Sequence, residues 1–168
     1  TLLVIITLLN DNNIGKWFIC YGSLLGLVRE NSCIDNDDDI DIMMNKDNYN
    51  EVKKILIRNN FTLEYSYGIN NSKNINSKNI IKTKTTSRYA SIDIYMVDFN
   101  DGGVSDVWNG SIITDCFLDK EKQTFIERNF NGQKIYYPNN YKRILINCYG
   151  TDYNIKKDEP PPQTMKYL

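Results

Sequence analysis

Residues 39–44 read Asp39-Ile40-Asp41-Ile42-Met43-Met44, with two carboxylates interleaved among large apolar side chains. This alternation is typical of a half-buried β-strand, in which side chains at i and i+2 share one face with their Cα atoms about 6.5 Å apart. Two ionised carboxylates on one face destabilise each other unless a cation lies between them. Because the ligands are oxygens, Mg²⁺ or Mn²⁺ is the natural cation. The stretch therefore predicts a strand that carries a divalent-metal site on Asp39 and Asp41.

The acidic run begins earlier, at Asp35-Asn36-Asp37-Asp38, and admits two other interpretations. An EF-hand loop that starts at Asp35 needs glycine at its sixth position and glutamate at its twelfth. The sequence has Ile40 and Lys46 there, so a calcium loop is excluded. A solvated acidic turn fits residues 35–38 but does not explain residues 39–44. Asp37 and Asp38 stay open as metal ligands or as supporting residues behind the ligands, and Asp37 is the further candidate ligand.

A candidate phosphate site lies upstream of the acidic strand. Gly22-Ser23 follows a short apolar run, residues 16–21, that predicts a buried strand, and it precedes a helix expected over residues 23–30 with Ser23 as its cap. Glycine permits close approach of the backbone to a ligand, and a helix N-terminus with a serine hydroxyl favours a phosphate group. Gly22 and Ser23 are therefore the predicted phosphate-binding residues.

A third carboxylate, Asp93, lies in the apolar run Ser91–Met96, which also predicts a strand. Taken alone, Asp93 could equally be a charge at the edge of a sheet. If its strand lies beside the strand of Asp39 and Asp41, Asp93 completes a cluster of three carboxylates that faces the phosphate site. The combination with Gly22-Ser23 favours this second interpretation.

The remaining pattern indicates an α+β fold, because helical and strand periodicities are mixed along the chain. We expect helices over residues 1–9, 45–58 and 139–150, strands over residues 61–67, 80–86 and 89–99, a hairpin over residues 125–137, and loops over residues 70–79 and 100–120.

Composition bounds the function further. The 168 residues include 41% apolar and 24% charged side chains, which fits one domain over residues 1–168, with a flexible proline-containing tail from about residue 156. The chain has no histidine, which excludes Ser-His-Asp and Cys-His nucleophiles and His-ligated zinc. The net charge of −1 gives no global basic field, so no nucleic-acid partner is expected. Lys82 and Lys84 are expected to be solvated charges.

Two further expectations concern the first residues and the cysteines. The apolar run at residues 1–9 is shorter than the roughly 20 residues that a membrane span needs, so no span is expected and a buried helix is predicted. The four cysteines include no C-x-x-C pair, and a chain with this apolar content can fold without disulfides, so we expect free thiols.

The segment Tyr21-Gly22-Ser23-Leu24-Leu25-Gly26-Leu27-Val28-Arg29, followed by Ile34 and by residues 37–42, resembles the LicD family of the nucleotidyltransferase (polymerase-β-like) superfold. That family includes bacterial phosphocholine transferases and the fukutin and fukutin-related ribitol-phosphate transferases. The resemblance runs from about residue 14 to about residue 160. The sequence departs from the family pattern at Ser23, where threonine is commoner, at Glu30, where histidine is frequent, and at residues 35–36, where the family has Pro-Trp.

The resemblance implies a mixed β-sheet flanked by helices and a metal-dependent transferase that moves a phosphorylated alcohol from a CDP-linked donor to a sugar or glycan hydroxyl. On this hypothesis Asp39 and Asp41 hold Mg²⁺ or Mn²⁺ on the donor diphosphate, and Asp93 shares a second ion or takes the proton of the acceptor hydroxyl. Gly22 and Ser23 hold phosphate oxygens, and Arg29 neutralises charge on the leaving CMP. Two alternatives stay open: a nucleotidylyltransferase that moves a nucleoside monophosphate from an NTP, and a catalytically silent nucleotide- or carbohydrate-binding domain.

Overall fold

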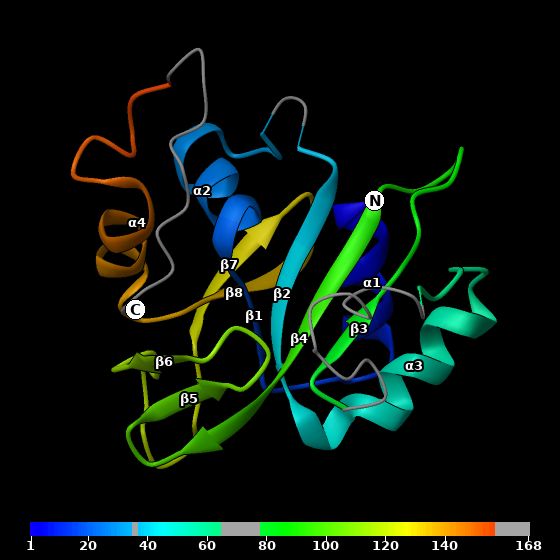
Figure 1. Ribbon diagram of the computed structural model, residues 1–168, viewed down its shortest axis with the longest axis horizontal. Helices are drawn as coiled ribbons and strands as arrows, with labels where there is room; N and C mark the ends of the chain where they lie inside the picture. Colours follow the sequence, from blue (N-terminus) through cyan, green and yellow to red (C-terminus); the bar gives the residue numbers. More distant parts are fainter. Residues whose placement is uncertain (35–36, 65–77, 157–168) are drawn as a thin grey trace.

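The computed structural model describes residues 1–34, 37–64 and 78–156. Its central six-stranded sheet has the order β1-β2-β4-β5-β6, with β3 pairing β4 off this path (Figure 1). A separate two-stranded sheet is formed by β7 and β8. The strands are β1 (Trp17–Ile19), β2 (Asp39–Asn45), β3 (Ile80–Lys82), β4 (Ser91–Asn100), β5 (Gly103–Asp106), β6 (Ser111–Thr114), β7 (Ile126–Phe130) and β8 (Gln133–Tyr137).

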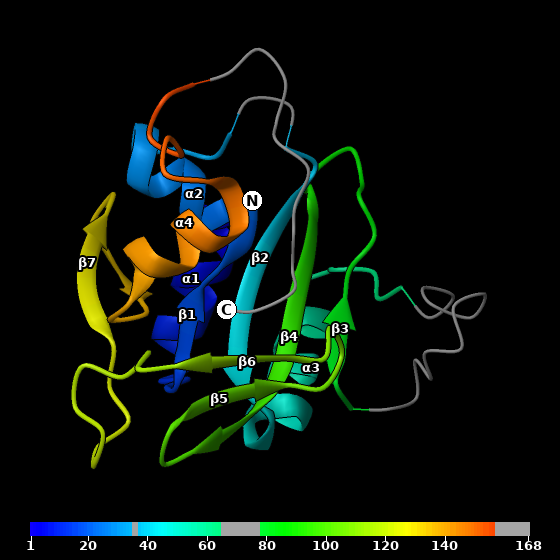
Figure 2. The same ribbon diagram turned by 60° about the vertical axis from the view of Figure 1, so that its left-hand side comes forward.

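Helices cover this sheet. Figure 1 shows α1 behind β4, and Figure 2 shows α3 behind β4, whereas α2 and α4 lie together beside β1. The helices are α1 (Leu2–Asp11), α2 (Tyr21–Glu30), α3 (Tyr49–Arg58) and α4 (Tyr141–Tyr149), with a 3₁₀ turn, η1, at Lys46–Asn48. The amphipathic pattern explains their placement, since Val52, Ile55 and Leu56 of α3 recur at helical spacing and are buried. The expected α+β class with a mixed sheet flanked by helices is confirmed.

The sheet is mixed because its central pair is parallel. β2 runs parallel to β4, whereas β1 is antiparallel to β2, and both β3 and β5 are antiparallel to β4. Apolar side chains fill the centre of this arrangement: Ile42, Met43 and Met44 of β2 are fully buried. The alternation in β2 predicts that one face of the strand is exposed to solvent. Asp41 is nevertheless only 6% exposed, because the start of α2 lies against its carboxylate. Both faces of β2 are therefore covered.

Several expectations about elements are confirmed and others are wrong. The first helix, the helix after residue 45, the hairpin and the last helix are present. Residues 100–120 were expected to form a loop, but they contain β5 and β6, which extend the sheet from the end of β4. The helix expected at residue 23 begins at Tyr21 with Cys20 as its N-cap, so Ser23 lies inside the first turn.

Other expectations fall partly outside the described residues. Within residues 61–64 of the expected strand 61–67, only an isolated bridge from Leu63 to Thr83 forms, and residues 65–67 are not among those described. The expected loop over residues 70–79 also lies mainly outside the described ranges, as do Asp35, Asn36 and the expected tail beyond residue 156. The four cysteines are free thiols, as expected. Within the described ranges, no helix combines the length and the hydropathy that crossing a bilayer requires.

Gly26 lets the segment that follows α2 fold back against the helix. A Cβ atom at residue 26 would lie 2.5 Å from the Ser32 carbonyl oxygen and 2.8 Å from the Ile34 amide nitrogen. Both contacts are with backbone, so a methyl group there requires the segment leading into β2 to move.

We therefore expect Gly26→Ala to lower the melting temperature by several degrees, since overpacking of this kind costs about 1–3 kcal/mol. Thermal unfolding followed by circular dichroism measures the effect. Gly15→Ala is the matched control, because a Cβ at residue 15 meets no atom within 4 Å. Alanine is the better helix former, so a stabilised Gly26→Ala variant would contradict this packing.

Candidate active site

The parallel pairing of β2 and β4 brings the predicted strand carboxylates together. Asp41 is the register partner of Asp93, and Asp39 is the partner of Ser91. Register partners on neighbouring strands point to the same face, as do residues at i and i+2 along a strand. Asp39, Asp41 and Asp93 therefore occupy one face at the start of the two strands.

Gly22 brings the first turn of α2 onto these carboxylates. A Cβ atom at residue 22 would lie 2.8 Å from Oδ2 of Asp37 and 3.6 Å from Oδ2 of Asp41. A side chain at residue 22 would displace the Asp37 carboxylate from this position. The preceding residue, Tyr21, has φ 45°, a left-handed conformation that is unfavourable for a tyrosine and that turns the chain from β1 into the helix.

Ser23 connects the helix to the acidic strand. Its hydroxyl oxygen accepts a hydrogen bond from the backbone N–H of Asp41 at 2.9 Å, and the residue is 1% exposed. The carbonyl oxygen of Asp41 in turn accepts a hydrogen bond from the backbone N–H of Cys20. Asp41 is thus fixed on both sides of its backbone by the segment that opens α2.

Three acidic residues before and at the start of β2 form a group that suits a cation. One carboxylate oxygen from each of Asp37, Asp38 and Asp39 lies within 4.8 Å of the others. Oδ2 of Asp37 is buried and has no hydrogen-bond partner, which is costly for a carboxylate without a cation beside it. The oxygen-only donor set suits Mg²⁺ or Mn²⁺, so these residues fit a divalent ion. Of the predicted ligands, Asp37 and Asp39 belong to this group, whereas Asp41 lies against Gly22 and Asp93 is bound by a lysine.

Burial and mutual repulsion raise the pKa values of the carboxyl groups. Burial, followed by the charges of Asp39 and Asp38, raises the pKa of Asp37 to about 6. The pKa of Asp41 is raised well above its usual value, chiefly by burial and then by Asp39 and Asp93. A cation at this position would oppose each of these shifts.

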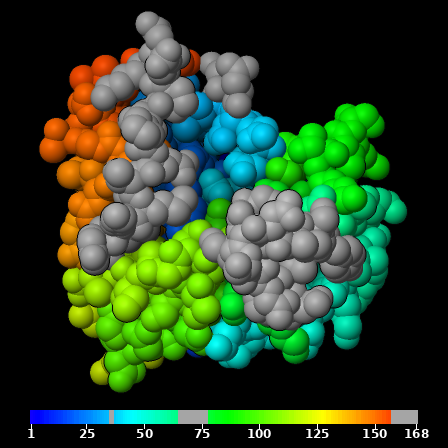
Figure 3. All heavy atoms as spheres, in the orientation of Figure 1, coloured from blue at the N-terminus to red at the C-terminus, as the bar shows by residue number. Residues whose placement is uncertain are grey.

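The segment leading into β2 is accessible. Figure 3 shows its sky-blue atoms on the surface of the face seen in Figure 1. Asp38 is exposed, and Asp37 and Asp39 are partly exposed. A substrate can therefore reach the three acidic residues from solvent, while Asp41 and Asp93 lie deeper.

Sequence reasoning missed Lys82. Its Nζ atom donates to both carboxylate oxygens of Asp93, at 2.6 and 2.7 Å, and its side chain is 17% exposed. The expectation that Lys82 is a solvated charge is wrong, because β3 pairs with β4 and makes Lys82 the register partner of Asp93. Lys84, by contrast, is half-exposed and lies 3.8 Å from a carboxylate oxygen of Glu64.

A buried network behind Asp41 was also missed. The Tyr95 hydroxyl donates to Oδ1 of Asp41 at 3.3 Å, and its ring packs edge-to-face on Tyr21 with ring centroids 5.1 Å apart. The Tyr21 hydroxyl donates to Oδ2 of Asp106, which also accepts from the side-chain amide of Asn109. Tyr95 lies two residues after Asp93 on β4 and therefore shares its face, a signal that the strand periodicity contains. Nothing local in the sequence indicated Asp106, which is 65 residues beyond Asp41 in the chain.

Arg29 lies in the last turn of α2, about 10 Å along the helix from Gly22 at a rise of about 1.5 Å per residue. Its guanidinium donates to Oε1 of Glu30, with Nε at 2.9 Å and Nη2 at 2.8 Å. Arg29 is therefore paired with Glu30 in the structure. A nucleotide that contacts Arg29 would have to extend along α2 from a phosphate bound at Gly22 and Ser23.

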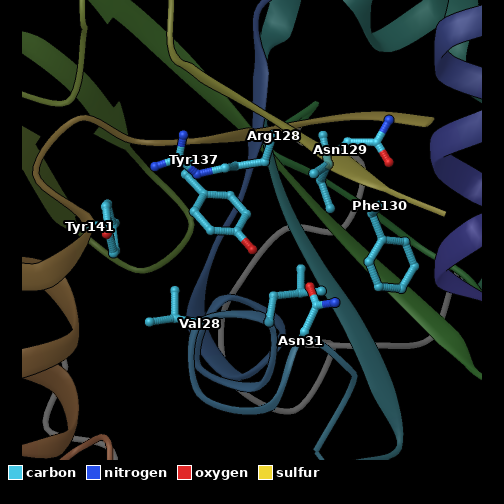
Figure 4. Close-up of a pocket in the computed structure, with 9 residues that line it drawn as sticks. Val28, Asn31, Arg128, Asn129, Phe130, Tyr137 and Tyr141 are labelled. Carbon is cyan, nitrogen blue, oxygen red and sulfur yellow. The ribbon is translucent and has the colours of Figure 1, made fainter. Parts of the chain in front are cut away.

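A hollow of about 240 Å³ lies at the other end of α2, away from the acidic residues. Figure 4 shows Tyr137 and Phe130 of the hairpin reaching toward Val28 and Asn31 at the end of the helix. Its lining contains no carboxylate. The chemistry suggested by the acidic residues is therefore not located in this hollow.

Comparisons with known proteins agree with this geometry. The family model described as LicD/FKTN/FKRP, nucleotidyltransferase domain, matches residues 14–140, a range that contains every residue of the acidic site. Among solved structures, the lincomycin-bound lincosamide antibiotic adenylyltransferase LnuA is similar with a TM-score of 0.53 and 18% identity, covering 82% of this chain and 77% of that chain. At this identity the likeness concerns the fold alone. A search of curated proteins gives no match.

The raised carboxyl pKa values predict how metal-free stability depends on pH. A carboxyl whose folded pKa exceeds its unfolded pKa stabilises the fold at low pH, and this contribution is lost as the pH rises through the folded value, about 6 for Asp37. We expect the chelator-treated protein to melt at a lower temperature at pH 7.5 than at pH 5.5. Asp37→Asn should raise the melting temperature at pH 7.5 and reduce the difference between the two pH values.

Asp101→Asn provides the control, since this carboxylate is exposed in the turn between β4 and β5. It should leave the pH dependence unchanged. An Asp37→Asn protein with the wild-type pH dependence would show that the acidic residues do not repel one another as described.

Proposed function

Because the chain belongs to the LicD/FKTN/FKRP family of nucleotidyltransferase-fold transferases, we propose that it moves a phosphorylated alcohol from a CDP-linked donor to a sugar or glycan hydroxyl, with Mg²⁺ or Mn²⁺ as cofactor. The alcohol would be of the phosphocholine or ribitol-phosphate kind that the resemblance implies. The family membership supports a transferase, and the donor and acceptor are the proposed part.

One observation supports the proposal most: Asp41 and Asp93 are register partners on parallel strands, and Oδ2 of Asp41 lies against Gly22 in the first turn of α2. A diphosphate carries several negative charges and would be repelled by bare carboxylates. It is attracted only if a cation joins it to Asp39 and Asp41. The backbone N–H groups at the start of α2 favour a phosphate at the same place.

Each residue of the site has a proposed task. The divalent ion, when bound, neutralises charge on the donor diphosphate and on the group that leaves. Asp39 and Asp41 hold it, with Asp37 as a further ligand. Gly22 lets the first turn of α2 lie close to the carboxylates and to the phosphates held there, and Ser23 keeps this turn fixed to β2 as well as offering its hydroxyl proton.

The transfer step follows from the donor's chemistry. The acceptor hydroxyl oxygen attacks the phosphorus that carries the alcohol, forming a new P–O bond, and the P–O bond to CMP breaks. In the proposed reaction Asp93 takes the hydroxyl proton or shares in holding metal. CMP leaves with the electron pair of the broken bond, and Arg29 is the proposed contact for its charge, about 10 Å further along α2.

We expect Asp39→Asn and Asp41→Asn each to lower kcat/KM by about 100-fold or more, comparable to the loss of a preorganised electrostatic group. The domain should stay folded, since the amide keeps the size of the side chain and removes repulsion. Steady-state turnover and calorimetric Mn²⁺ binding measure the two effects, with Asp101→Asn as control. Unaltered Mn²⁺ affinity in both variants would show that Asp39 and Asp41 are not metal ligands.

Product identity tests the reaction itself. We expect metal-dependent release of CMP from a CDP-alcohol, increased by a sugar acceptor, and no pyrophosphate from any NTP, as followed by chromatography of the nucleotides. Pyrophosphate from CTP or ATP, without CMP from CDP-choline or CDP-ribitol, would favour a nucleotidylyltransferase. Binding of these nucleotides without any product would favour a silent binding domain.

A further inference from the structure

Three neighbouring strands align their charged residues in one row. Asp41 on β2 is the register partner of Asp93 on β4, and Asp93 is the register partner of Lys82 on β3. Partners across neighbouring strands share a face of the sheet. Strand pairing therefore brings the ammonium group of Lys82 to the acidic site, by the same register that brings Asp41 and Asp93 together.

The contact between Lys82 and Asp93 is close and shielded from water. Nζ of Lys82 lies 2.6 Å from Oδ1 and 2.7 Å from Oδ2 of Asp93, and the two side chains are 17% and 5% exposed. Charge-assisted hydrogen bonds at this distance are among the strong ones, and buried pairs are little screened by salt.

We propose that Lys82 takes the place of a second divalent ion: the site binds one ion through the carboxylates of the β2 segment, and the Lys82 ammonium supplies the remaining positive charge beside Asp93. This inference rests on the proposed function in that it assumes a metal-dependent transferase. It leaves Asp93 as a residue held by Lys82 and not as a ligand of a second ion.

The distances argue against a second ion while Lys82 is in place. A Mg²⁺ or Mn²⁺ ligand bond to oxygen is about 2.0–2.2 Å long. An ion on either oxygen of Asp93 would therefore lie at most about 4.9 Å from Nζ of Lys82, given the 2.6 and 2.7 Å contacts. A doubly charged ion and an ammonium at that separation repel each other strongly in a partly buried site. The β2 carboxylates, in contrast, retain an unpartnered buried oxygen on Asp37 for an ion of their own.

The experiment counts Mn²⁺ ions bound to the purified protein, by electron paramagnetic resonance of free Mn²⁺ and by calorimetry. We expect one tightly bound ion per chain for the wild type. Lys82→Met keeps the apolar stem and removes the charge, so the count should rise to two as Asp93 becomes available. Lys82→Arg keeps the charge and should keep the count at one.

Lys84→Met is the matched control, because it removes the same charge two residues along the chain from a half-exposed lysine. Its count should stay at one. If Lys82→Met does not fold, Lys82→Gln tests the same point, since the amide still donates to Asp93 without carrying a charge.

Two ions on the wild type, or a single ion on both the wild type and the uncharged Lys82 variants, would overturn the inference. The count is independent of the reaction. One ion without CMP release would contradict the proposed function alone, whereas CMP release with two ions would contradict only the role of Lys82.

Discussion

The parallel pairing of β2 with β4 is the constraint on which the site depends. It places Asp41 beside Asp93 within the sheet, where both carboxylates are nearly inaccessible to water. Burying like charges side by side is unfavourable unless other groups compensate. Each neighbouring element supplies such a group: Lys82 comes from β3, the Tyr95 hydroxyl from β4, and the helix start from α2.

The apolar residues between the carboxylates make this arrangement possible. Ile42, Ile92 and Ile94 are fully buried and Ile40 nearly so, and they hold the two strands between the helices. The core therefore offsets the cost of an acidic face that is poorly stable by itself without a cation. Locally unfavourable features lie at this site, where Tyr21 is left-handed and the pKa values of Asp37 and Asp41 are raised. Such features are typical of functional sites.

Local patterns in the sequence predicted much of the fold and the centre of the site. The acidic alternation of residues 39–44 indicated β2, and the glycine before an apolar helix indicated where α2 meets it. The predictions that were wrong concern residues whose positions depend on pairing between segments distant in the sequence. Lys82 looks like a surface charge until β3 pairs with β4, and β5 and β6 are short strands that extend β4 without a clear period of their own. Ser23 was expected to cap α2, but the turn at Tyr21 starts the helix earlier and leaves its hydroxyl to bind β2.

The most direct test of the account is the position of the metal. Crystals grown with Mn²⁺ and a CDP-alcohol would reveal the ion by its anomalous scattering. The account predicts a peak within bonding distance of carboxylate oxygens of Asp39 and Asp41, with the donor diphosphate on its open side and Lys82 still bound to Asp93. A peak away from these carboxylates, or a diphosphate bound elsewhere on the molecule, would contradict it.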